Sequence, residues 1–340
     1  MPINLSIQVL ENQQRFIPAE HQLALLLDLL LERGAEPHFL LRKTGIFYQD
    51  ILGGELKISP KQLARLCLNI SLQSNDRDIS FVFGQRLFPG VFEQYSHLLT
   101  HAPNLRSLLG VLCRHFTDYF PLLKPRLVDC REQTHLLFED PFGESLRPNQ
   151  QPEQLAYRRW IQEALVSAIV SLCEWRAAAP LPWQIQFDYP APSWRAEYQV
   201  HLGDQVKFSQ TYSALSIAQQ YLDKPWQQHS AIIYQLAHSK VNLSQHDSLL
   251  SIIRELLRQN ISQLPSLEQI AQQLALSPAT LKRRLKSHHS SYRLLCDEVR
   301  QQHAFFLQAQ YNYSDNELST AMNFFDVSNF RRAFRRWLSQ

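Results

Sequence analysis

The chain has 340 residues, 45% of them hydrophobic, so it is long enough for a substantial core and predicts about two domains. Its formal net charge is only +3, which excludes a uniformly basic or acidic protein. The charge is uneven, however. Residues 277–340 carry ten Lys and Arg against five Asp and Glu, while the first 276 residues have a net charge of −2. A basic end on a mildly acidic body predicts a polyanion-binding module joined to a second domain.

Cysteine usage and hydropathy exclude several other classes of protein. The five cysteines are far apart and form no CxxC or Cys/His zinc spacing, which predicts reduced, mostly buried thiols. The longest apolar run, residues 23–32, is short and interrupted by Asp28, so it predicts a core helix and not a membrane span. The N-terminus shows no basic segment followed by an apolar one, as a secretory signal would. We therefore expect a cytoplasmic protein without a membrane partner or cofactor.

The first 240 residues predict a mixed domain that is mostly helical with a small sheet. Apolar residues recur at helical spacing over 22–34 and 59–70. Residues 152–179 predict a long amphipathic helix that Pro180 ends. Alternating or β-branched and aromatic segments predict strands. These segments are 126–130, 134–139, 182–189 and 198–203. We place a linker at residues 241–250, and from residue 251 to 340 the pattern is wholly helical.

Residues 266–288 predict two short helices joined by a tight turn at 275–277. Ser266 and Gln269 have the spacing of a capping box, and Ser277 followed by Pro278 is a typical start of a second helix. Leu281 and Leu285 face inward in that helix, which leaves its Lys and Arg side chains on the outer surface. This pattern is typical of a helix-turn-helix with a basic second helix.

The pattern recurs over residues 315–337, with a turn near Asn323 and a capping candidate at Asp326. An apolar stripe along the last helix predicts that it packs on its own domain and leaves its four arginines facing outward. The stripe consists of Phe330, Ala333, Phe334 and Trp337. Residues 291–310 predict one long helix connecting the two units.

With these features the chain resembles the AraC/XylS family of bacterial transcription regulators. The motifs SLEQIAQQLALSPATLKRRLK, CDEVRQQHA and SNFRRAFRRW resemble its DNA-binding domain, which has two helix-turn-helix units. GQRLFPG (84–90), FDYPAPSWRAEY (187–198) and VKFSQ (206–210) resemble the arabinose-binding-like sensor domain of one subgroup. The chain departs from the family pattern at Asn323 and His289, where glycine is usual, and in the segment after Trp337, so we expect the second unit to contribute less to specificity.

The resemblance implies DNA contacts from both basic helices. In the first, Ala279, Lys282 and Arg283 occupy base-facing positions, and Ala279 suits a thymine methyl. Arg284 and Lys286 are expected to bind phosphate. In the second, the candidates for base contacts are Ser328, Arg331 and Arg332, and Asn329 is a further DNA-binding candidate. Arg335 and Arg336 either bind phosphate or keep the helix soluble.

The resemblance further implies an activator controlled by a small-molecule effector on residues 1–240. Its expected partners are the major groove of double-stranded DNA, RNA polymerase, an unidentified effector and a second copy of the chain. One alternative is an effector-independent DNA-binding protein whose first domain only dimerises or binds a protein partner. Another is an enzyme targeted by a helix-turn-helix, but the sequence lacks GxSxG, P-loop and GxGxxG motifs. His97 and His101 have zinc-pair spacing without the adjacent Glu or a third ligand.

Aromatic residues of the first domain fit two interpretations. They line an apolar effector pocket or they form the core, and the residue pattern leaves both open. These residues are Phe81, Phe83, Phe88, Phe92, Tyr95, Phe116, Tyr119 and Phe120. Arg86 likewise fits two interpretations: its guanidinium binds an anionic group, or it holds a loop in place.

Overall fold

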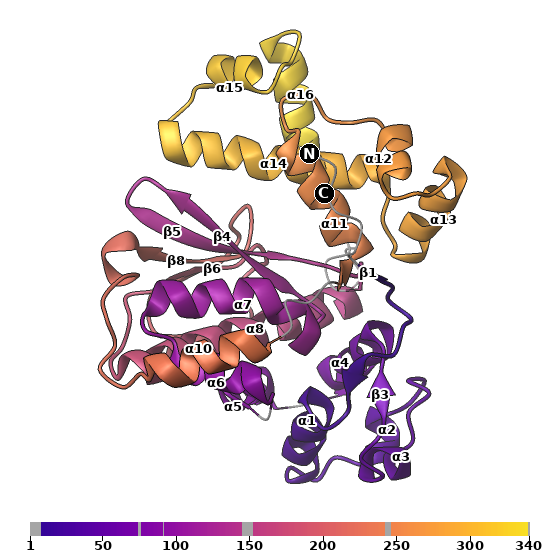
Figure 1. The fold of residues 1–340 in the computed structure, drawn as a ribbon, viewed down its shortest axis with the longest axis vertical. Helices are drawn as coiled ribbons and strands as arrows, with labels where there is room; N and C mark the ends of the chain where they lie inside the picture. Colours follow the sequence, from indigo (N-terminus) through magenta and orange to yellow (C-terminus); the bar gives the residue numbers. More distant parts are fainter. Residues whose placement is uncertain (1–7, 74–75, 91, 145–151, 242–245, 339–340) are drawn as a thin grey trace.

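A computed structural model describes residues 8–73, 76–90, 92–144, 152–241 and 246–338. Figure 1 shows a body of helices around a central sheet, with the helices that follow residue 248 gathered at one end and α1 to α4 at the other. The helices of the body are α1 (Gln22–Leu31), α2 (Pro37–Leu40), α3 (Tyr48–Leu52), α4 (Pro60–Gln73), α5 (Ile79–Leu87), α6 (Gln94–His101), α7 (Leu105–Tyr119), α8 (Pro152–Ala177), α9 (Arg195–Leu202) and α10 (Ala231–Lys240). The C-terminal helices are α11 (Leu249–Gln259), α12 (Leu267–Gln273), α13 (Pro278–Ser287), α14 (Tyr292–Tyr311), α15 (Asp315–Ala321) and α16 (Val327–Leu338).

The main sheet has five strands in the order β4-β5-β8-β6-β7. The hairpin of β4 and β5 pairs Lys124 with Glu139 and Cys130 with Gln133, and α7 packs on β4. Figure 1 shows α7 and α8 on one side of this sheet and α14 on the other. The C-terminal helices therefore contact the sheet directly. The strands are β1 (Gln8–Leu10), β2 (Ile17–Pro18), β3 (Lys57–Ile58), β4 (Lys124–Cys130), β5 (Gln133–Glu139), β6 (Gln184–Gln186), β7 (Val206–Lys207), β8 (Ala214–Ala218) and β9 (His246–Ser248).

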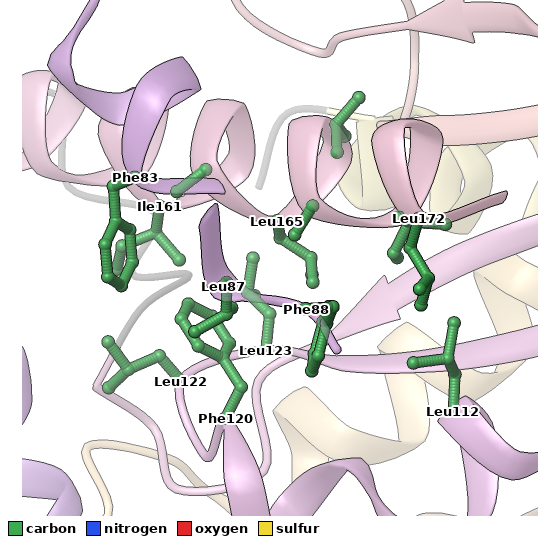
Figure 2. Close-up of a cluster of buried hydrophobic side chains, with 14 of the residues drawn as sticks. Phe83, Leu87, Phe88, Leu112, Phe120, Leu122, Leu123, Ile161, Leu165 and Leu172 are labelled. Atoms are coloured by element: carbon green, nitrogen blue, oxygen red, sulfur yellow. The ribbon is translucent and has the colours of Figure 1, made fainter. Parts of the chain in front are cut away.

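The core of the body surrounds the long helix α8, which is buried over most of its circumference between Tyr157 and Arg176. Figure 2 shows Leu165 and Leu172 of α8 facing side chains of the neighbouring elements, with Leu87 of α5 beside Phe120 and Leu112 of α7 opposite Leu172. Such burial is typical of a helix that is covered on several sides, and here it includes the polar residues Gln162, Glu163 and Ser167. The aromatic residues that fit either an effector pocket or the core are packed in this core, except Phe116, whose side chain falls outside the described ones. Their burial favours the core interpretation.

Gly84 allows α5 and α8 to approach each other closely. A Cβ at this position would lie 2.2 Å from the carbonyl oxygen of Ala164 and 2.9 Å from Cβ of Ser167. We expect Gly84→Ala to push the two helices apart and to lower the free energy of unfolding by about 1–3 kcal/mol. Urea unfolding checks this, with Gly110→Ala as the control, because a Cβ at Gly110 meets only the end of the Arg114 side chain, at 3.7 Å. Equal midpoints for the two variants would contradict the close-contact explanation.

Most predicted elements are confirmed, but two strand predictions are wrong. Residues 198–203 lie mainly in helix α9, and Tyr198 and Leu202 are buried one helical turn apart. Apolar and polar residues alternate over this short segment as in a strand, but Tyr198 and Leu202 are also spaced as on one face of a helix. Only Gln184–Gln186 of the predicted strand 182–189 pairs in the sheet.

The segment expected to be a linker contains ordered structure. Residues 246–248 form β9, which pairs in parallel with β1, so that Val9 packs against the C-terminal core. Ser248 then caps α11 by accepting a hydrogen bond from the Ser251 amide at 3.1 Å. Residues 242–245 of the expected linker lie outside the described residues. The N-terminal strand β1 thus packs at the junction between the body and the C-terminal helices.

The C-terminal helices form two separate hydrophobic clusters along α14. The first half of α14 contributes Leu295 and Val299 to a cluster with α11, α12 and α13. The second half contributes Ala304 and Leu307 to a cluster with α15 and α16. Each short helix pair is therefore packed at its own end of one helix.

Candidate nucleic-acid interface

The first helix pair consists of α12 and α13. The capping box of Ser266 and Gln269 is present, with both hydrogen bonds formed. The turn places Ala275 in the left-handed region at φ 53°, and the Leu276 amide donates to the carbonyl of Ala271 at 2.8 Å. Ser277 caps α13 through the Thr280 amide. This local hydrogen bonding fixes the direction in which α13 leaves α12.

The outer face of α13 is basic and exposed. Leu281 and Leu285 are fully buried against the domain, while Ala279, Lys282, Arg283 and Lys286 are exposed. Within the described part of the chain, no carboxylate lies within 4 Å of Lys282, Arg283 or Lys286. These three cations are therefore available to a ligand at no cost in broken ion pairs.

Arg284, in contrast, is engaged by the N-terminal segment. Its Nη1 lies 3.4 Å from Oε1 of Glu11, and Asn12 Nδ2 donates to the carbonyl of Ser287 at 3.0 Å. His288 is fully buried beside them, with Nε2 2.5 Å from Oε2 of Glu11 and Nδ1 3.0 Å from the carbonyl oxygen of Phe142. Any phosphate contact of Arg284 would compete with this ion pair to Glu11. No signal in the sequence links residues so far apart, so sequence reasoning missed this contact.

The second helix pair consists of α15 and α16. Ser314 and Glu317 form another capping box. Asn323 adopts the left-handed conformation at φ 54°, as its substitution for glycine predicts, and its side chain donates to the carbonyl of Ser262 at 2.7 Å. Asp326 caps α16 by accepting from the Asn329 amide at 2.7 Å. The predicted apolar stripe is confirmed, because Phe330 and Trp337 are fully buried.

Along the outer face of α16, only some of the side chains predicted to contact DNA have no ion-pair partner among the described residues. Ser328, Arg332 and Arg335 are exposed, and no described carboxylate lies within 4 Å of either arginine. Asn329 donates from Nδ2 to Oδ2 of Asp326 at 2.9 Å, and Arg331 pairs with Asp315 at 2.5 Å. Asn329 is thus part of the helix cap, and Arg331 has to exchange an exposed ion pair for any base contact.

Arg336 has a structural role that the sequence did not reveal. Its Nη2 lies 2.8 Å from Oδ1 of Asp297, and Nε1 of Trp337 donates to the same oxygen at 2.9 Å. Asp297 is buried on α14, so these bonds attach α16 to the connecting helix. An acidic residue among apolar positions of α14 is the only sequence signal that pointed to such a partner.

Both helix pairs pack on α14, which has 20 residues and measures about 30 Å at the standard rise. The first pair packs with the first half of α14, whereas α16 runs along α14 so that Trp337 reaches Asp297 and Gln301. The connecting helix is thus comparable in length to one turn of B-DNA, about 34 Å.

The described residues give little support for a metal site or for a membrane-spanning helix. His97 and His101 stack their rings at 6.4 Å, and within these residues no group of three potential ligands is placed to hold a metal ion. In the same part of the chain, none of the helices combines the length and the apolar character that crossing a membrane requires. Arg86 lies 3.8 Å from Glu32, an exposed pair.

Comparisons with known proteins show the family of the chain. Residues 34–226 match the family described as the arabinose-binding domain of AraC transcription regulator, N-terminal. The chain is 24% identical to the ornithine utilization regulator of Pseudomonas aeruginosa over 92% of its own length and 91% of that protein. It is 32% identical to the regulator VqsM of the same species over 23% of this chain and 24% of that protein. The crystal structure of the P. aeruginosa regulator CdpR covers 94% of this chain and 95% of its own, with a TM-score of 0.46 and 15% identity. The family match spans more than half of the chain, which therefore belongs to the AraC-type transcription regulators that carry an arabinose-binding N-terminal domain.

Proposed function

We propose that the two helix pairs are helix-turn-helix units that place α13 and α16 in successive major grooves of one DNA site. The domain arrangement that accompanies this proposal is a sensor over residues 1–240, a linker at 241–250 and a DNA-binding domain over 251–340. The observation that carries the proposal is the set of exposed cations on the outer faces of α13 and α16 that have no carboxylate within 4 Å among the described residues. Such cations supply affinity by releasing counterions from phosphate, and a few side chains per helix read bases.

We further infer that the sensor controls DNA occupancy in response to a small molecule, and that the protein activates transcription through RNA polymerase. The direct contacts of the body with α13 and α14 support this control, because a change in the body reaches both basic helices through them. An effector acts only if it binds two arrangements of the domains with different affinity. A transcription regulator acts on the chromosome, so we place this protein in the cytoplasm. We further propose that it forms a homodimer.

Arg283→Ala tests which side chains read bases. Arg283 is exposed and unpaired, and its planar guanidinium suits the O6 and N7 atoms of guanine. We expect the variant to lose about 1–3 kcal/mol of discrimination at one base pair. Arg335→Ala, with a similarly exposed arginine, should weaken binding evenly across sequences and lower the salt slope by about one. Binding to a set of single-base operator variants measures both. An unchanged base preference in Arg283→Ala would contradict the proposed orientation of α13.

A further inference from the structure

A cavity lies between the sheet of the body and the connecting helix α14. It has a volume of about 110 Å³. Its walls come from β4, β5, α8 and the segment before β8 on one side and from α14 on the other. No other element of the C-terminal helices contributes. The lining includes Val128, Cys130, Leu137, Tyr212, Phe305 and Phe306. Any molecule in this cavity touches both parts of the chain at once.

The chemistry of the walls favours a neutral occupant. Most lining side chains are apolar, and the lining includes no Lys or Arg. The single carboxylate, Asp188, is already bound to Arg158 and accepts from the Ser213 hydroxyl at 2.8 Å. Burial lowers the pKa of His135, which keeps the imidazole neutral, and its Nδ1 lies 2.7 Å from the Ser216 hydroxyl. An anion would thus enter an apolar space without a compensating charge, at a high cost in desolvation.

The size of the cavity suits a ligand with about one ring. Its volume of about 110 Å³ is comparable to the roughly 150 Å³ of an apolar cavity that accommodates benzene, and its rim is open at the exposed Ala309, which leaves room for a substituent. The polar lining groups, among them His135, Gln162 and Ser213, offer hydrogen bonds to one polar substituent.

Polar contacts surround the cavity and hold the two parts of the chain together. Arg126 of β4 donates from Nη2 to Oε1 of Gln302 at 2.9 Å, and Arg131 donates from Nε to the carbonyl of Gln310 at 2.9 Å. The rings of Tyr212 and Phe305 meet across the boundary with centroids 5.3 Å apart. Filling the space between these contacts stabilises one orientation of α14 relative to the sheet, and α14 carries both helix pairs.

We propose that this cavity is the effector site and that it binds a small, neutral, single-ring molecule with one hydrogen-bonding substituent. The inference rests on the proposed function, since an effector has meaning only for a regulator. A ligand in the cavity contacts the sensor sheet and α14 together, so its affinity depends on how the two are arranged. This dependence couples occupancy of the cavity to the positions of α13 and α16.

The test uses the full-length protein and four one-ring probes. Phenol and benzyl alcohol are neutral, benzoate is an anion, and benzylamine is a cation. Ala309→Trp places an indole at the exposed rim of the cavity, and Gln308→Trp, at the neighbouring exposed position that does not line it, is the matched control. Ligand-observed NMR titration and thermal melting measure binding. Sequence-selective DNA binding is measured separately on the same preparations.

We expect the neutral probes to bind the natural protein and Gln308→Trp and to bind Ala309→Trp at least about tenfold more weakly, a difference of about 1.4 kcal/mol. Equal binding to Ala309→Trp would place the site elsewhere and overturn the proposal. Preferential binding of benzoate or benzylamine would overturn its chemistry. Absence of neutral binding, in preparations that still select DNA, would overturn the effector site and leave the DNA-binding function intact. Binding of the probes without any DNA selection would instead contradict the regulator function.

Discussion

Trp337→Ala should unfold the second helix pair and leave the first intact. The ring is fully buried, with centroids 6.0 Å from Phe324 and 6.1 Å from Phe334, and its Nε1 donates to Asp297. Removing a buried Trp costs about 3–5 kcal/mol, and the loss also deprives a buried carboxylate of a donor. Because α15 and α16 form a small cluster of their own on α14, the loss should be local.

Hydrogen exchange measures this prediction element by element. We expect faster exchange of amides in α15 and α16, with exchange in α12 and α13 close to that of the natural protein. Arg335→Ala is the control, since Arg335 is exposed and has no described ion-pair partner. Protection of α16 that survives in Trp337→Ala would show that the aromatic stripe does not hold this helix.

Glu139→Gln should loosen the C-terminal helices from the sheet. Glu139 is buried at the end of β5, where it binds Arg258 of α11 and accepts from Nε of Arg126 at 2.9 Å. The substitution retains the shape but leaves two largely buried guanidinium groups without their carboxylate, at a cost of about 3–5 kcal/mol. Small-angle scattering and urea unfolding measure the loosening. Glu255→Gln is the matched control, because Glu255 also contacts Arg258, at 3.5 Å, but is exposed.

The same carboxylate predicts how stability depends on pH. Burial alone would raise the pKa of Glu139, but the charges of Arg258, Arg126 and Arg254 outweigh it and hold the pKa at about 2. An acid whose pKa is lower in the folded state stabilises it above the unfolded value. This contribution, up to about 3 kcal/mol, is lost as the pH falls from about 4.5 towards 2. We expect Glu139→Gln to flatten the unfolding free energy over this range, and an unchanged acid slope would contradict the assignment.

The sequence predicted the C-terminal helices well because their signals are local. The capping box at Ser266, the cap at Asp326 and the stripe from Phe330 to Trp337 act over a few residues, and each was found at its predicted position. The second capping box, at Ser314, has the same local spacing but was not predicted. The left-handed turn at Asn323 follows from backbone preference alone. In the body, short segments such as 198–203 are too brief to distinguish a strand period from a helical one, and β8 carries no distinct signal.

The contacts between the two parts of the chain could not be predicted in this way. Glu11 with Arg284 and Glu139 with Arg258 join residues far apart in the sequence, so no periodicity records them. The close approach of Gly143, whose Cβ would lie 1.7 Å from the carbonyl oxygen of His288, likewise depends on packing. For the candidate interface, sequence reasoning identified the basic faces correctly but did not show that Arg284, Arg331 and Arg336 have intramolecular partners.

Selection of a random duplex library by the purified full-length protein tests the central claim most directly. Sequencing the bound fraction reports each base position that the protein reads. The account predicts two enriched blocks with centres about 10 base pairs apart, because two helices that enter successive major grooves on one face of the duplex are one helical turn apart. Loss of only one block in Trp337→Ala would assign that block to α16. A library that emerges without enrichment, at a salt concentration where the protein still binds DNA, would contradict sequence reading by these helices.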